Sequence, residues 1–126
     1  MLQVNLPHVV AEVTAAYRRY ERALETNDVA TLDELFWESP LTVRYGLREN
    51  LYGHAEIAAF RAAVHPAGAK VHEGTVLTTF GEDAATVNTM FRRPTTPSRV
   101  GRQSQSWIRT PAGWRIVAAH VSVIEL

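Results

Sequence analysis

The sequence contains no cysteine, no excess of either charge and no long apolar run. Without cysteine, the chain has no disulfide bonds and no thiolate chemistry. Thirteen basic residues balance thirteen acidic ones, so no net field attracts nucleic acid or an anionic membrane. No apolar segment approaches the ~20 residues of a membrane-spanning helix, and no signal-peptide pattern follows Met1. We therefore expect a cytoplasmic protein that binds neither nucleic acid nor membrane.

The sequence also lacks the motifs of common cofactor and metal sites. It contains no glycine-rich phosphate-binding loop and no Gly-x-Ser-x-Gly turn of the kind that holds a catalytic serine. Its histidines are scattered without metal-ligand spacing, at His8, His54, His65, His72 and His120. We expect no metal and no cofactor, so any chemistry has to come from ordinary side chains.

What the sequence does contain is a globular composition, with 46% hydrophobic and 21% charged residues in a chain of 126. This length suits one domain with a real core, and we assign residues 1–126 to a single domain. Asn5 is the expected N-cap and Pro7 is expected in the first turn of a long first helix. Apolar residues at three- and four-residue steps place Val10, Val13, Tyr17, Tyr20 and Leu24 on one stripe of this helix. Charged residues beside that stripe, Glu21 among them, are expected to face water.

Shorter elements follow this helix. Asn27 and Asp28 indicate a helix end and the cap of a second, short helix. A third helix is expected at 54–64, and strands at 41–45, 71–80, 84–93 and on both sides of a turn at 110–113. Helices that are separate in sequence from a strand meander predict the α+β class, with three helices packed on a curved, mainly antiparallel sheet.

The closing hairpin is the most informative segment. With 110–113 as the turn, Trp107 faces Ile116, and continued pairing sets Gln105 opposite Ala118 and Gln103 opposite His120. One face then mixes apolar and polar groups, as a ligand pocket does: Gln103, Gln105, Trp107, Ile116, Ala118, His120 and Ser122. The other face has an apolar half that suits a dimer seam, with Val117, Ala119, Val121 and Val123. A slip of one residue would redistribute both sets.

Two further residues are candidates for chemistry. Tyr20 lies on the apolar stripe, so its phenol is either a core tyrosine bonded to backbone or a buried proton donor. Arg44 lies in a short strand between Val43 and Tyr45, where a guanidinium needs an anionic partner. That partner is either a protein carboxylate or a substrate carboxylate gripped in bidentate fashion.

The remaining candidates are weaker. His120 is either a satisfied core histidine or a ligand-binding group with Gln103 and Ser122 as partners. The large aromatic side chains of Trp37, Phe60 and Trp107 are expected in the core or in pocket walls. Arg92, Arg93 and Arg102 are interpreted as surface or interface charges.

Several segments together resemble a known family. A tryptophan strand followed by Gly-Trp-Arg-Ile-Val and His-x-Ser (Trp107, 113–117, 120–122) is similar to the SnoaL-like, ketosteroid-isomerase-like superfamily, also called nuclear-transport-factor-2-like. The runs TNDVATLDELFW, VRYGLRENLYG, FRR and GRQSQSWIRTPAGWRIVAAHVS resemble the HpxZ/AtzH-like family, which is associated with oxalurate and triazine (cyanuric acid) catabolism. The resemblance covers nearly the whole chain and implies a cone-shaped fold around one pocket.

The same resemblance implies a function. The family's activity is decarboxylation of 1,3-dicarboxyurea by a homodimer, with a first-helix tyrosine and a first-strand arginine that correspond to Tyr20 and Arg44. Protonation of the nitrogen releases CO2 from an N-carboxylate, so Arg44 would orient the carboxylate and Tyr20 would supply the proton. The residues then left to hold the urea core or exclude water are Trp37, Phe60, Gln103, Gln105, Trp107, His120 and Ser122.

Two alternatives remain open. The first is a non-catalytic accessory or assembly subunit for an amidase-signature hydrolase, which would be its partner in oxalurate or triazine catabolism. An isomerase or dehydratase ranks third, because such enzymes use an acidic base and no acidic residue is expected on the inward faces.

Overall fold

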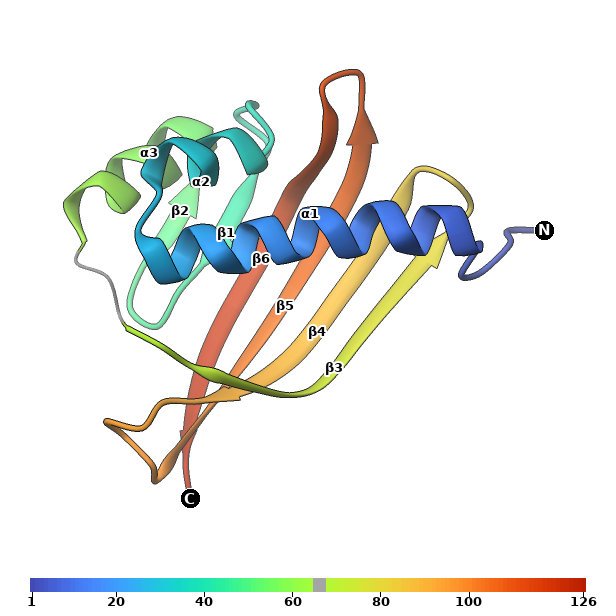
Figure 1. The fold of residues 1–126 in the computed structure, drawn as a ribbon. Coiled ribbons are helices and arrows are strands. Elements are labelled where there is room, and N and C mark those ends of the chain that lie inside the picture. Colours follow the sequence, from blue (N-terminus) through green and yellow to red (C-terminus); the bar gives the residue numbers. More distant parts are fainter. Residues whose placement is uncertain (65–67) are drawn as a thin grey trace.

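The computed structural model describes residues 1–64 and 68–126, in which three helices pack against one six-stranded sheet (Figure 1). The expected α+β class is therefore confirmed. In chain order, the elements are α1 (Pro7–Thr26), α2 (Val29–Leu35), β1 (Val43–Tyr45), β2 (Asn50–Tyr52), α3 (His54–Ala63), β3 (Val71–Phe80), β4 (Ala84–Arg92), β5 (Arg99–Thr110) and β6 (Gly113–Glu125). None of the helices in these ranges is both long and apolar enough to span a membrane.

The sheet has the strand order β2-β1-β6-β5-β4-β3. Its neighbours are antiparallel except for β1 and β6, which run parallel. Helix α1 crosses one face of the long strands, while α2 and α3 lie at the end where β1 and β2 extend the sheet (Figure 1). Strand β2 has only three residues and was not predicted, because so short a segment has no readable periodicity.

Helix α1 buries one face against the sheet, formed by Val9, Val13, Tyr17, Tyr20 and Ala23. The predicted stripe is thus correct at its centre and displaced by one residue at each end. Leu6 is the N-cap residue, whereas Asn5 accepts a hydrogen bond from the backbone N–H of Thr79 through Oδ1 at 2.9 Å. The predicted boundary after α1 is confirmed, because Asn27 adopts the left-handed conformation and Asp28 caps α2.

The predicted register of the closing hairpin is wrong beyond Trp107. Trp107 does pair with Ile116, but a bulge follows, so that Ser106 pairs with Ala118 and Ser104 with His120. One extra residue on β6 is enough to exchange its two faces. The inward face of the hairpin is therefore formed by Gln103, Gln105, Trp107, Ile116, Ala119, Val121 and Val123.

This register also removes the basis for the expected dimer seam. Ala119, Val121 and Val123 all line the interior cavity described below, so they are not available as an outer apolar surface. The outer side of β6 instead presents Ala118, His120 and Ser122, which pair with polar residues of β5. The homodimer itself stays a prediction.

Candidate functional site

A cavity of about 520 Å³ opens between the helices and the inward face of the sheet. Tyr20 of α1 and Arg44 of β1 both line it, although 24 residues separate them in the sequence. Phe60 of α3 and Gln103 of β5 lie in the same lining. With His120, the fold thus brings five of the predicted site residues around one space of the size of a small-molecule pocket.

Tyr20 is the most deeply placed polar side chain of this lining. It is 4% exposed, and its ring makes edge contacts with Phe36 and Trp107 at centroid distances of 6.1 and 6.5 Å. Burial raises the pKa of the Tyr20 phenol, while the charges of Arg61 and Arg44 oppose that rise. The phenol is therefore protonated at neutral pH and able to donate a proton or hydrogen bond into the cavity.

Gln105 and Trp107 support Tyr20 from behind. The Trp107 indole Nε1 donates a hydrogen bond to Gln105 Oε1 at 3.0 Å, and both side chains are buried. An indole nitrogen is only a donor, so this bond fixes which end of the amide carries the oxygen. The Gln105 amide also lies close enough to lower the pKa of Tyr20, a minor effect beside burial.

Arg44 projects into the cavity from the inward side of β1, where its neighbour on β6 is the small residue Ala119. Its Nη1 donates to Glu49 Oε1 at 2.9 Å, and its guanidinium carbon lies 5.2 Å from the centre of the Phe60 ring. Arg44 was expected to pair with either a protein carboxylate or a substrate carboxylate, and the structure shows the protein carboxylate of Glu49. Only Nη1 is engaged by residues within the described ranges, so the guanidinium keeps further donors for a ligand.

Gly46 makes the Arg44–Glu49 pair possible. A Cβ atom at position 46 would collide with the Glu49 carboxylate and lie 2.9 Å from Arg44 Nη1. The turn between β1 and β2 therefore leaves space that the ion pair fills. The side chains of Arg44 and Glu49 are only 12% and 22% exposed, so this pair is a fixed wall of the cavity.

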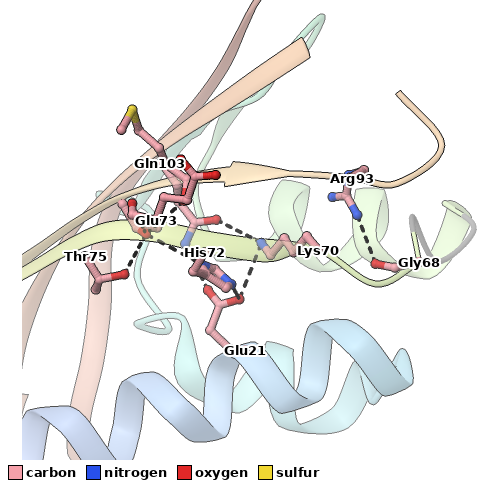
Figure 2. Close-up of polar contacts among 10 residues, drawn as sticks. Glu21, Gly68, Lys70, His72, Glu73, Thr75, Arg93 and Gln103 are labelled. Carbon is pink, nitrogen blue, oxygen red and sulfur yellow. Dashed lines mark hydrogen bonds and ion pairs between the residues drawn. The ribbon is translucent and has the colours of Figure 1, made fainter. Parts of the chain in front are cut away.

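A second polar cluster closes the cavity beside Gln103 (Figure 2). Glu21 Oε2 lies 3.4 Å from Lys70 Nζ and 3.0 Å from His72 Nε2, while Gln103 Nε2 donates to Glu21 Oε1 at 3.0 Å. Lys70 Nζ also donates to Gln103 Oε1 at 3.3 Å. Burial lowers the pKa of Lys70, and the Glu21 carboxylate opposes that shift. The cluster connects α1 to β3 and β5, and the Glu21 carboxylate compensates the buried positive charge of Lys70.

Four predicted site residues are absent from the described lining. Gln105 and Trp107 lie behind Tyr20, and Trp37 borders a separate hollow with Phe36 and His54. His120 is in the lining, although it pairs with Ser104 and its ring contacts that of Tyr45, at a centroid distance of 6.0 Å, on the outer side of the sheet. Ser122 pairs with Arg102 on that outer side. The pairing of His120 and Ser122 with Gln103 fails because of the bulge in β6.

The structure adds residues that the sequence reasoning missed. Glu21 was expected to face water, yet its side chain is 14% exposed and points inward. A signal was present, because Glu21 follows the buried Tyr17 by four residues and so lies on the same helix face. Arg61, Lys70 and Arg93 also line the cavity. Their inward direction depends on loops and packing that no local pattern specifies.

Within the described ranges, no group of three His, Asp or Glu side chains is arranged to hold a metal ion. His65 lies outside the described residues.

Three kinds of comparison relate the chain to known proteins. The model of the AtzH-like family matches residues 2–126. A Pectobacterium atrosepticum protein of unknown function is 54% identical, with a TM-score of 0.94 and coverage of 97% of this chain and 95% of that one. A cystatin-like fold protein from Burkholderia xenovorans is 46% identical, with a TM-score of 0.96 and coverage of 100% and 99%. No curated protein matches the chain.

More distant structures share the fold. A nuclear transport factor 2-like superfamily protein from Salmonella enterica is 25% identical, with a TM-score of 0.69 and coverage of 91% of this chain and 90% of that one. The expected superfamily is thereby confirmed.

Proposed function

The chain belongs to the AtzH-like family, and from this premise we propose that it is a cofactor-free decarboxylase of a small N-carboxylated urea, of the 1,3-dicarboxyurea type. The observation that carries the proposal is the placement of Tyr20 and Arg44 in one cavity. A protonated phenol and a cation with free donors are the two groups that the reaction requires. The proposal includes an amidase-signature hydrolase as the enzyme that works beside it.

The proposed step transfers one proton. Arg44 binds the carboxylate of an N–COO⁻ group, and the Tyr20 hydroxyl donates its proton to the adjoining nitrogen. The C–N bond then breaks, its electron pair stays on nitrogen, and the carboxylate leaves as CO2. Water returns a proton to the Tyr20 phenolate. No oxidant and no electron sink is needed, because the nitrogen accepts the electrons.

The surroundings of Tyr20 favour this role. Gln105 lowers the pKa of the Tyr20 phenol and so opposes part of the rise that burial causes. The positive charges of Arg44 and Arg61 stabilise the phenolate that forms after proton transfer. Phe60 covers the Arg44 guanidinium and limits the access of water.

The test is release of CO2 from N-carboxylated ureas, followed by mass spectrometry with the carboxyl carbon labelled. We expect turnover by the native protein and its loss in Tyr20→Phe and Arg44→Ala, with both variants folded by circular dichroism. Arg102→Gln is the matched control, because Arg102 is an exposed arginine outside the described cavity lining. Native-like turnover in either Tyr20→Phe or Arg44→Ala would refute the assignment.

An accessory role for an amidase is the second candidate. It is favoured by the apolar side chains at the β1–β2 edge, where Leu41, Leu47 and Tyr52 are 74%, 60% and 54% exposed. This candidate predicts no CO2 release from any carboxylated urea, together with co-elution of the hydrolase on size-exclusion chromatography. Substitution of Leu47 and Tyr52 by serine would then abolish co-elution, whereas Tyr20→Phe would not.

A further inference from the structure

Arg61 is a half-buried cation of the cavity to which the proposed chemistry assigns no contact with the substrate. It lies in α3 next to Phe60 and lines the same space as Tyr20 and Arg44. Among the residues that the structure describes, none forms a hydrogen bond or ion pair with its guanidinium. Burial lowers the pKa of Arg61, while Tyr20, Asp33 and Glu49 oppose this shift and the like charge of Arg44 adds to it. A guanidinium nevertheless stays protonated, so the cavity holds a positive charge with no directly bonded anion among the described residues.

The other inward cations of the lining differ from Arg61. Arg44 is paired with Glu49, and Lys70 is paired with Glu21. Arg93 donates to the backbone carbonyl of Gly68 at 2.9 Å. These side chains are held by the protein itself, whereas Arg61 is poised for an external anion. Burying an unpaired guanidinium is costly unless a ligand repays that cost.

We propose that Arg61 forms a second anion subsite, which binds the distal carboxylate of a dicarboxylated substrate while Arg44 holds the carboxylate that is lost. This inference rests on the proposed function. It names Arg61 as the residue that recognises the second negative charge of the substrate. Arg44 and Arg61 line the same cavity as the Tyr20 phenol, so a small ligand with two carboxylates would place one against each cation. A monocarboxylated compound would leave Arg61 unpaired in the complex.

Binding measurements test the subsite without turnover. Glutarate has the same number of backbone atoms between its carboxylates as 1,3-dicarboxyurea, and glutaramate replaces one carboxylate by a neutral amide. By isothermal titration calorimetry, we expect the native protein to bind glutarate at least about tenfold more tightly than glutaramate. Arg61→Gln should reduce this preference to about twofold or less, and Arg61→Lys should restore part of it. Arg102→Gln, at an exposed arginine outside the described cavity lining, is the control and should keep the full preference.

The outcomes separate the two proposals. A native preference that survives in Arg61→Gln overturns the subsite, whatever the protein catalyses. Equal affinity of the native protein for glutarate and glutaramate overturns it as well. If the preference depends on Arg61 but no carboxylated urea is turned over, the subsite stands and the decarboxylase proposal fails. Thermal unfolding of each variant establishes that lost binding does not reflect lost folding.

Discussion

The Trp107 indole donates its hydrogen bond to the Gln105 side chain at 3.0 Å, directly behind the ring of Tyr20. Trp107 and Gln105 are buried core residues, whereas Tyr20 lines the cavity, so this contact lies between the core and the candidate site. It fixes the direction of the amide, and Gln105 lowers the pKa of the phenol that we propose as the proton donor. Two buried residues outside the described cavity lining therefore support that phenol.

The first prediction concerns Gln105 as a positioning residue. Gln105→Leu leaves the buried indole N–H of Trp107 unsatisfied, which should lower the free energy of unfolding by about 1–3 kcal/mol. Urea denaturation measures this loss. Ser104→Ala, an exposed substitution on the neighbouring outer position, should stay within about 0.5 kcal/mol of the native protein. Equal stabilities of Gln105→Leu and Ser104→Ala would contradict the buried bond.

The second prediction concerns the charge balance of the cavity. Glu49→Gln keeps an oxygen that accepts the Arg44 hydrogen bond and removes one negative charge beside it. Affinity for glutarate should therefore rise several-fold, and the gain should shrink at high salt because it is electrostatic. Titration calorimetry at two ionic strengths checks this. Weaker binding by Glu49→Gln would mean that the carboxylate itself is required at the site.

The third prediction concerns the Glu21 cluster. Glu21→Gln leaves Lys70 and His72 without their carboxylate, and Lys70 is only 5% exposed. Breaking one side of a buried pair should cost about 3 kcal/mol in the free energy of unfolding. The half-exposed pair of Arg19 and Glu34 provides the comparison, and Glu34→Gln should cost less than about 1 kcal/mol. The cluster is not structural if the two variants lose the same stability.

The fourth prediction concerns high pH. Burial raises the pKa values of Tyr17 and Tyr20 above the ordinary value of 10.0. Above that value the unfolded chain releases these protons and the folded chain retains them, so stability should fall as pH rises beyond about 10. Tyr17→Phe should flatten this decline in urea denaturation series at pH 9 to 11. A decline of the same slope in Tyr17→Phe would exclude Tyr17 as its source.

The sequence predicted the parts of the fold that depend on local patterns. The boundary at Asn27 and Asp28, the strand Val71–Phe80 and the turn of the closing hairpin all follow from capping, alternation and turn chemistry. The bulge in β6 has no such signal, since Ile116, Val117 and Ala118 are all compatible with a regular strand. The one extra residue of this bulge decides which face of the sheet His120 and Ser122 occupy.

The candidate site was predicted only in part for the same reason. Tyr20 was identifiable because helical spacing fixes its direction, and Arg44 because a charge inside a short strand needs a partner. The identity of that protein partner was not predictable, because Glu49 returns through a turn that Gly46 makes possible. Arg61 has no distinctive neighbours in sequence, and only the packing of α3 against β1 reveals its direction.

The most direct test of the account is CO2 release by Tyr20→Phe measured beside Tyr17→Phe. Both are buried tyrosines on one face of α1, but Tyr20 lines the cavity and Tyr17 is absent from its described lining. With a carboxyl-labelled dicarboxyurea, we predict a rate about 10²–10⁴-fold below the native one for Tyr20→Phe and a rate within a few-fold of native for Tyr17→Phe. A folded Tyr20→Phe protein that releases labelled CO2 at the native rate would contradict the account.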